Sequence, residues 1–451
     1  MDRFLFTRAA EPAHLLIRGA HVLDPRTGLD GRADVLIRGG HIAEIAAPNS
    51  IPPPDGGDVL DATGKHLFPA FVDPHVHLRT PGQEYKETIA TGTAAAAAGG
   101  FGTVVAMANT APAVDDASIL RAQTQTAQRE ARVPVGFLAA ITRAQKGDEL
   151  TEMAELRDAG ALGFSDDGWP VVSAGMLRKA LQYQRLCGGV LVLHEEDPAL
   201  SAAGAMHEGP VSARLGLAGI PSVSESTMVA RDAALALYED GRVHFQHLSC
   251  AESVAALERA KQAGAPVSAE VCPHHLTLTD DSVLSLDSRF KMNPPLRGHS
   301  DRTELVRALR TGLIDCIATD HAPHATHEKE VPFEQAAMGT TGLETAFAAI
   351  YTRLVLGGEI ELSTLIERMT AGAALLNLPV PRIARDQLAS VCVVDLEASW
   401  EVGARGYVSR SENCCFHGQT LCGRVLLTVT AGAVAFRAPA VAESATLQAV
   451  R

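Results

Sequence analysis

The sequence predicts an α/β protein, in which a (β/α)8 barrel carries a small β-sandwich module formed by both chain ends. From Phe68 onward, short apolar runs alternate with helix-length amphipathic stretches, which is typical of a parallel sheet. Eight such runs can be counted, and eight strand-helix units close a barrel. Both chain ends have strand-like patterns but too little apolar surface to fold alone, so we expect them to fold together.

The β-module begins near the N-terminus. Residues 15–45 (LLIRGAHVLDPRTGLDGRADVLIRGGHIAEI) combine β-branched residues with Gly and Asp turns, which indicates short antiparallel strands. A similar pattern returns after Ala389, in SVCVVDLEASWEV and GRVLLTVTAGAVAFR. We therefore predict that residues 1–67 and 389–451 form the β-sandwich and that residues 68–388 form the barrel.

The barrel strands and helices follow in alternation. We predict strands that end near His77, Met107, Ala140, Ser165, His194, His247, Cys272 and Thr319. The helices that follow them are predicted over 87–98, 115–131, 148–159, 173–187, 224–240, 251–263, 300–311 and 341–357. Asp115 is the predicted N-cap of the second helix, and glycines at 99, 100 and 160 are predicted helix stops.

Composition narrows the class of protein. No apolar run approaches the roughly 18 residues of a membrane span, and the N-terminus lacks the apolar segment of a signal peptide, so we expect a cytoplasmic protein. The eight cysteines include no C-x-x-C pair, which favours reduced thiols. A formal net charge of -14 argues against nucleic-acid and anionic membrane partners. An anionic small-molecule substrate would therefore need cationic groups within its pocket.

Six side chains with metal-binding chemistry follow the predicted strands. His75 and His77 lie on one side of the first strand, because strand side chains alternate. Asp167 follows the fourth strand, His194 ends the fifth, His247 ends the sixth and Asp320 follows the eighth. Barrel active sites form where strands end, and nitrogen and oxygen donors of this kind suit zinc. We predict one or two zinc ions, with Asp167 as a candidate bridge between two.

Each of these residues also has a plainer explanation. An isolated H-x-H is more often a pair of core or solvated histidines, and Asp166-Asp167-Gly168 is compatible with a simple turn. His194, which is followed by two glutamates, is compatible with a paired surface histidine. The placement of all six at strand ends favours metal binding.

Other polar residues follow the same strand ends. Asp320 is the candidate general base and acid, with a purely structural ligand as the alternative. Arg79, Asn109, Asn293 and His324 are candidate substrate contacts, and an arginine fork suits a carboxylate. For Asn293, which precedes two prolines, a role in a turn is nearly as well supported. Together these residues predict a pocket for a small anionic amide.

A long connection follows Asp320. Residues 321–339 (HAPHATHEKEVPFEQAAMG) exceed the usual length of a loop between a strand and a helix, and such loops often act as lids. We expect His327, Glu328 and Lys329 to form a solvated face without chemistry. His274 and His275 are expected either to shape the pocket wall or to serve the structure alone.

These residues resemble a known family. The stretch DPHVHLRTPGQEYKETIATGTAAAAAGGFGTVVAMANTAP, with GFSDDGWPV, LHEED, FQHLS, KMNPPLR and ATDHAPH, is similar to the bacterial type I dihydroorotases of the amidohydrolase superfamily. The resemblance covers the barrel and reaches both terminal segments. It implies a TIM-like metal-dependent hydrolase barrel with a β-sandwich. It also implies zinc-dependent, reversible cyclisation of N-carbamoyl-L-aspartate to L-dihydroorotate, a step of pyrimidine (UMP) biosynthesis.

Position by position, the resemblance implies zinc ligation by His75, His77, Asp167, His194, His247 and Asp320, with proton transfer by Asp320. It implies substrate contacts from Arg79, Asn109, Asn293, His324 and the backbone near Met338 and Gly339. Departures are small: MANTAP stands where M-P-N-T-x-P is usual, and GGFGT lacks a common second threonine.

Two alternatives stay open. A hydantoinase or allantoinase has the same barrel, but such enzymes usually bridge their metals with a modified lysine, and strand four offers only Asp166 and Asp167. A non-catalytic scaffold for aspartate transcarbamoylase would be expected to have lost metal ligands. We also expect a homo-oligomer, and association with that transferase is compatible with catalysis.

Overall fold

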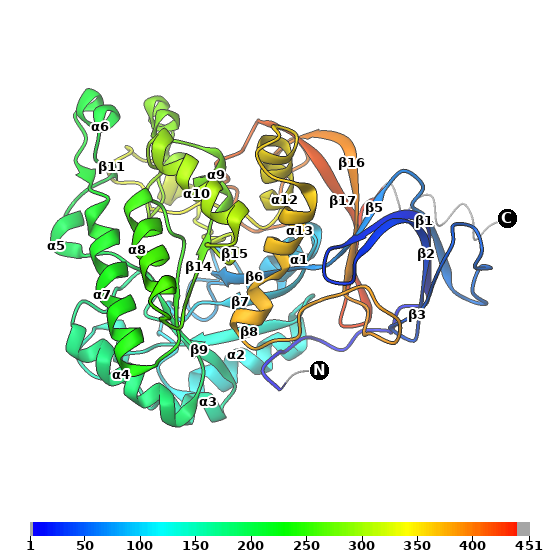
Figure 1. Ribbon diagram of the computed structural model, residues 1–451, viewed down its shortest axis with the longest axis horizontal. Coiled ribbons are helices and arrows are strands. Elements are labelled where there is room, and N and C mark those ends of the chain that lie inside the picture. Colours follow the sequence, from blue (N-terminus) through cyan, green and yellow to red (C-terminus); the bar gives the residue numbers. More distant parts are fainter. Residues whose placement is uncertain (1–2, 440–451) are drawn as a thin grey trace.

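The computed structural model describes residues 3–439, which form a barrel and a sheet beside it (Figure 1). The barrel strands are β6 (Phe71–Val76), β7 (Phe101–Ala106), β8 (Val135–Ala139), β9 (Ala161–Phe164), β10 (Leu191–Leu193), β13 (Val243–Phe245), β14 (Val267–Val271) and β15 (Cys316–Ile317). They pair in this order and all in parallel. The His77 amide donates to the His321 carbonyl at 2.9 Å, so the first strand meets the chain just after the last one. The predicted barrel is confirmed.

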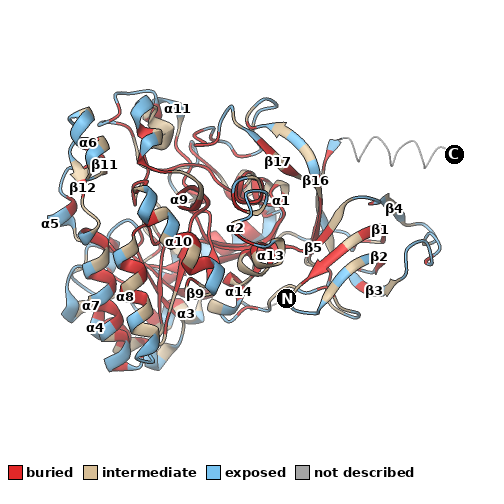
Figure 2. Ribbon diagram, turned by 45° about the horizontal axis from the view of Figure 1, so that its top comes forward, coloured by how far each residue is buried: buried red, intermediate tan, exposed pale blue. Residues whose placement is uncertain are grey.

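Helices cover the outside of the barrel. They are α1 (Ile89–Ala98), α2 (Ala117–Glu130), α3 (Met153–Asp158), α4 (Ala174–Cys187), α7 (Val223–Glu239), α8 (Ala251–Gln262), α10 (His299–Thr311), α12 (Ala346–Ile350), α13 (Leu362–Thr370) and α14 (Gly372–Leu375). Figure 2 shows their outer faces exposed around a buried core of strands. Residues of β8, β9 and β10 are buried throughout, as expected for parallel strands covered on both faces. None of the described helices is both long and apolar enough to cross a membrane.

Two local predictions about these helices were wrong. The N-cap of α2 is Asp116, whose side chain accepts from the Ser118 amide, whereas Asp115 accepts from the amide of Ala144 in the next loop. The last predicted helix, 341–357, has an α-helical part of only five residues, α12, and continues as a π-helical turn over Tyr351–Val355. The spacing of apolar residues identifies neither the exact N-cap residue nor a change from α-helical to π-helical turns.

The segment between β10 and α7 contains small elements that the sequence pattern did not predict. They are α5 (Pro198–Ser201), β11 (Met206–His207), α6 (Pro210–Leu215) and β12 (Gly219–Ile220). The strands β11 and β12 form a separate two-stranded parallel sheet. Two further short helices lie in other connections, α9 (Pro273–Thr277) after β14 and α11 (Thr326–Lys329) after β15.

Both chain ends contribute to the second sheet, as predicted. Its strands are β1 (Leu15–Asp24), β2 (Leu29–Arg38), β3 (His41–Ala46), β4 (Asp58–Asp61), β5 (His66–Pro69), β16 (Val391–Glu401), β17 (Thr420–Thr430) and β18 (Ala433–Arg437). The structure forms them as one eight-stranded sheet, in which β16 pairs with β5. Gly40 has a φ of +80°, and a Cβ there would lie 2.9 Å from the Gly432 carbonyl oxygen, so glycine permits the two ends to meet.

The predicted division of the chain stays a prediction. Strand β5 spans the boundary proposed between residues 67 and 68 and pairs within the terminal sheet. The last part of the segment 389–451, residues 440–451, lies outside the described residues, as do residues 1 and 2. All eight cysteines lie within the described residues and are free thiols.

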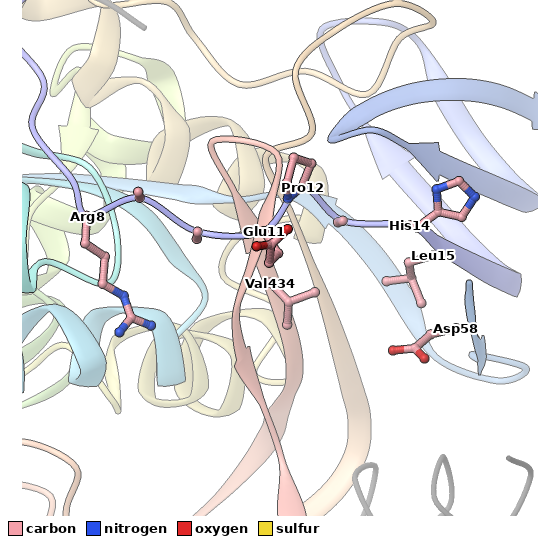
Figure 3. A pocket seen from close by; sticks show the side chains of 10 residues that line it. Arg8, Glu11, Pro12, His14, Leu15, Asp58 and Val434 are labelled. Carbon is pink, nitrogen blue, oxygen red and sulfur yellow. The ribbon is translucent and has the colours of Figure 1, made fainter. Parts of the chain in front are cut away.

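The N-terminal segment connects the barrel to the sheet. Phe6 exchanges two backbone hydrogen bonds of 2.9 Å with Val135 of β8, and the Ala13 amide donates to the Gly432 carbonyl at 2.7 Å. Residues 8–13 of this segment line an open groove, together with Val434 of the terminal sheet (Figure 3). No predicted site residue lies in this groove, so the candidate chemistry is elsewhere.

Candidate active site

The predicted site residues gather at the ends of seven barrel strands or in the connections that follow them. His75 lies within β6, and His77 and Arg79 follow it. Asn109 follows β7, Asp167 follows β9, His194 directly follows β10, His247 follows β13 and Asp320 follows β15. Asn293 lies in the connection after β14, and His324, Met338 and Gly339 lie in the connection after β15. Because parallel strands end on one side of a barrel, all these residues reach the same face.

These residues enclose a small cavity of about 190 Å³. Five of the six predicted metal ligands and all six predicted substrate residues line it, together with Gly168 and Ala322. The sixth predicted ligand, His75, is fully buried, and its Nε2 lies 3.4 Å from Oδ1 of Asp320. The structure therefore brings together every residue that the sequence singled out for chemistry.

The backbone is strained at three of these residues. Arg79, His247 and Asp320 have φ angles of +56°, +29° and +45°, a region that side chains other than glycine rarely adopt. Such conformations persist where the surrounding structure enforces them, and they cluster at functional sites. Gly339, with a φ of +142°, has no room for a side chain, because a Cβ would lie 2.8 Å from the Cβ of Ala322.

The imidazoles point nitrogen atoms at two carboxylates. Asp320 Oδ1 lies 2.9 Å from His77 Nε2, and Asp167 Oδ2 lies 3.5 Å from the same nitrogen. Asp167 Oδ1 lies 3.6 Å from His75 Nε2, 3.8 Å from His194 Nδ1 and 3.9 Å from His247 Nε2. Asp167 thus lies within 3.9 Å of all four imidazoles, and its predicted role as a bridge between two metal ions stays a prediction.

The donor set fits a metal cation. Ligand atoms of His75, His77 and Asp320 lie within 4.8 Å of one another, and so do those of His75, Asp167 and His247. The Nδ1 of His194 and the Nε2 of His247 approach to 2.9 Å. Buried imidazole nitrogens and carboxylate oxygens that converge in this way match the ligands of zinc and related divalent ions.

In three of the imidazoles, the ring nitrogen that points away from Asp167 and Asp320, called the outer nitrogen below, has a hydrogen-bond partner. His75 Nδ1 lies 2.7 Å from Glu270 Oε1, and His77 Nδ1 lies 2.9 Å from Asn109 Oδ1. His194 Nε2 lies 3.0 Å from Glu196 Oε2, which also accepts from Asn293 Nδ2 at 2.6 Å. An acceptor at the outer nitrogen fixes the tautomer that leaves the inner nitrogen free to bind a cation.

Two acidic partners in this arrangement were missed from the sequence, Glu196 and Glu270. Glu196 stands in the run His194-Glu195-Glu196, and its pairing with His194 was considered only as the alternative to metal ligation by that histidine. Glu270 is a single acid within the apolar strand VSAEV, and a charge inside a barrel strand is the signal that could have identified it.

Burial and charge act in opposite directions on the ionisable groups. Burial opposes ionisation of Asp320, but His75 and His77 outweigh it and lower the pKa of this carboxyl below its usual range. The pKa of Asp167 is lowered for the same kind of reason, chiefly by His75. Burial would lower the pKa of His75, but the surrounding carboxylates raise it well above the ordinary value. Both aspartates are therefore ionised at neutral pH.

Arg79 places a cationic group in the cavity wall. Its side chain is 8% exposed, and its Nε donates to the Pro323 carbonyl at 3.2 Å. Burial lowers the pKa of Arg79, against the attraction of Asp320 and Asp167. A guanidinium in this position can bind a carboxylate within the cavity.

The connection after β15 differs from prediction at Lys329 and, in part, at Glu328, which is half-buried and lies 2.8 Å from Lys86 Nζ. His327 is exposed, as expected, but Lys329 is buried, and its ammonium donates to the carbonyls of Lys291, Ala337 and Gly339. Lys329 therefore ties this connection to the cavity wall, and its assignment to a solvated face was wrong. Of the two histidines after β14, His275 contacts the Pro294 carbonyl at 3.0 Å, and neither histidine lines the cavity.

A cluster of candidate metal ligands on the C-terminal face of a (β/α)8 barrel, with a second sheet from both chain ends, defines the class: the fold and site are those of a cyclic amidohydrolase. A solved structure of the same class agrees, the L-hydantoinase (dihydropyrimidinase) from Arthrobacter aurescens. It aligns with a TM-score of 0.82 at 26% identity over 94% of this chain and 96% of that chain.

Sequence relatives define the family. A family model described as dihydro-orotase-like matches residues 64–253. A dihydroorotase of Anaeromyxobacter dehalogenans is 45% identical over 93% of this chain and 97% of its own length. One from Pelotomaculum thermopropionicum is 44% identical over 93% and 98%. The chain belongs to the dihydroorotase family.

Proposed function

We propose that this protein is a zinc-dependent dihydroorotase, which converts N-carbamoyl-L-aspartate and L-dihydroorotate into one another in pyrimidine biosynthesis. The observation that carries the proposal is that Arg79 lines the same cavity as the cluster of imidazoles and aspartates. Relatives named dihydroorotase, 41–45% identical over most of the chain, support the same substrate.

The substrate would be held at both ends. Arg79 and Asn109 clamp the carboxylate that dihydroorotate carries outside its ring, and this contact offsets the negative charge of the protein. Asn293, His324 and the backbone of Met338 and Gly339 contact the ring. His324 donates from Nε2 to the Met338 carbonyl at 2.8 Å, which fixes the imidazole against this part of the wall.

The metal would be held by His75, His77, Asp167, His194, His247 and Asp320, with one or two zinc ions. Zinc lowers the pKa of a bound water to about 7 and polarises a carbonyl oxygen, which is the chemistry that amide hydrolysis needs.

Asp320 carries the proton. Its lowered pKa keeps it ionised, so it can accept a proton from the attacking water as the new C–O bond forms at the ring carbonyl carbon. When the C–N bond breaks, the same carboxyl delivers that proton to the departing ring nitrogen. In the reverse direction, the carbamoyl nitrogen attacks the side-chain carboxyl carbon while Asp320 removes a proton from that nitrogen. The same carboxyl then gives this proton to the departing oxygen as the C–O bond breaks and water leaves.

Parallel assays test the substrate. We expect purified, zinc-supplied protein to hydrolyse L-dihydroorotate with a kcat/KM at least about 100-fold above that for hydantoin or allantoin, because only dihydroorotate offers Arg79 a carboxylate. Faster turnover of hydantoin or allantoin would reassign the substrate. Absence of turnover in metal-loaded protein would favour a scaffold for aspartate transcarbamoylase.

The setting of the enzyme is also a proposal. We propose a cytoplasmic location, which the free cysteines support, and a homo-oligomeric assembly, which the mass of the purified protein in solution would test. Association with aspartate transcarbamoylase can be tested by mixing the two proteins and measuring whether they co-elute.

A further inference from the structure

Glu270 lies where an acidic side chain is least expected. It belongs to β14, its side chain is completely buried inside the barrel, and the neighbouring positions Ala269 and Val271 are buried and apolar. An ionised carboxylate in such a place is costly unless several donors surround it. Its position therefore requires a set of partners.

Three N–H groups supply these partners. Glu270 Oε1 lies 2.7 Å from His75 Nδ1 and accepts from the His247 amide at 3.3 Å. Glu270 Oε2 lies 3.0 Å from His244 Nε2, and the Nδ1 of the same ring lies 2.8 Å from Ser268 Oγ. The Glu270 carboxylate thus contacts the side chain of His75, which lies in β6, and the backbone of His247, which follows β13. Both histidines are proposed metal ligands.

This arrangement fixes the state of His75. A carboxylate can only accept, so Nδ1 of His75 carries a proton, and Nε2, which faces Asp167 and Asp320, is the nitrogen left to bind a cation. The bond to the His247 amide also holds the turn in which His247 has its strained φ of +29°. Without Glu270, His75 could rotate or carry its proton on the nitrogen that must face the metal.

We propose that Glu270 is the positioning residue of the metal centre, which sets the tautomer and orientation of His75 and the backbone of His247. Glu270 does not line the cavity. It acts on the reaction only through the two histidines. The inference rests on the proposed metal site and not on the identity of the substrate.

The test measures metal binding without substrate. Glu270→Gln keeps the volume of the side chain but replaces one carboxylate oxygen with an NH2 group. Either His75 or His244 then faces a donor instead of an acceptor. We expect zinc affinity, measured by competition with a chromophoric chelator, to fall by roughly 10- to 100-fold, as is typical when the outer partner of a ligand histidine is removed. The visible spectrum of the cobalt-substituted protein should change as well, because the ligand geometry changes.

Glu239→Gln is the matched control. Glu239 is also a buried glutamate with several donors, since it contacts Arg178 Nε at 2.6 Å and Arg185 at 3.1 Å, but it ends α7 away from the cavity lining. The zinc affinity and the cobalt spectrum of the Glu239→Gln variant should equal those of the wild type. Excess zinc should restore kcat of Glu270→Gln with KM unchanged, as expected for a residue that acts through the metal.

The outcomes separate the possibilities. Zinc affinity of Glu270→Gln within threefold of the wild type, or an equal loss in Glu239→Gln, would overturn the proposal. If Glu270→Gln does not fold, Glu270→Asp decides, because its carboxylate is one methylene short of His75. Weakened zinc binding with an altered cobalt spectrum then supports the proposal, and unchanged binding overturns it. A protein that binds zinc normally but does not hydrolyse dihydroorotate would contradict the proposed function alone.

Discussion

The substitution Arg79→Met tests how the substrate is recognised. Arg79 lines the cavity, and its Nε is already engaged by the Pro323 carbonyl, so the two terminal nitrogens remain for a ligand. Methionine keeps an apolar side chain of similar reach and removes the charge and all the donors. The change therefore deletes the proposed clamp without opening a large cavity.

The size of the effect follows from the two free donors. A hydrogen bond to a charged group contributes about 1.5–3 kcal/mol, and two at the low end of this range give about 3 kcal/mol. The low end applies because Asp320 and Asp167 already attract the guanidinium before substrate binds. Since 1.4 kcal/mol is a factor of ten, we expect KM for dihydroorotate to rise by about 150-fold. Because the contact is made equally in the ground and transition states, kcat should change by less than about threefold.

The assay compares two substrates. Dihydroorotate and 5,6-dihydrouracil share the ring amide, but only the first has the carboxylate, so Arg79→Met should leave kcat/KM for dihydrouracil nearly unchanged. Arg79→Lys, which keeps the charge and loses the planar fork, should give an intermediate KM. Zinc content should match the wild type in both variants. An unchanged KM for dihydroorotate, or an equal loss with both substrates, would refute the clamp.

Three further predictions concern other parts of the molecule. Asp320→Ala should lower kcat by roughly 10²- to 10⁴-fold while largely sparing zinc content, and near-normal turnover would remove its role in proton transfer. Lys329→Met removes a buried ammonium that donates to three carbonyls and should lower the free energy of unfolding by about 1–3 kcal/mol, whereas exposed His327→Ala should change it by less than about 0.5 kcal/mol; equal denaturation midpoints would contradict this difference. Burial opposes ionisation of Glu225, but Arg297 and Ser249 outweigh it and lower its pKa below the ordinary 4.5, so its ionised form stabilises the fold above that pH and loses this contribution as the pH falls. The stability advantage of the wild type over Glu225→Gln should therefore shrink between pH 6 and pH 3, and a constant difference would be the contrary result.

Much of the fold could be predicted because the barrel repeats one local pattern. Each predicted strand end lies within two residues of an observed strand end, since a buried parallel strand is an uninterrupted apolar run. The small elements between residues 198 and 220 were missed because they are too short to have a period. The α12 helix was predicted too long, since hydrophobic spacing cannot distinguish an α-helical from a π-helical turn.

The site was predicted where position along a strand determines position in space. His75, His194 and Asp320 could be placed together because all barrel strands end on one face. Contacts between side chains on different strands were beyond this reasoning. The sequence could not reveal that Glu270 reaches His75, or that Lys329 turns inward among backbone carbonyls, because both depend on three-dimensional packing.

The most direct test of the central claim is a dihydroorotate hydrolysis assay on purified protein, before and after chelation, with the metal content of each sample measured. We predict that activity disappears as zinc is removed and returns in proportion to the zinc bound on re-addition. Full activity in metal-free protein, or no activity at full zinc occupancy, would contradict the assignment of a zinc-dependent dihydroorotase.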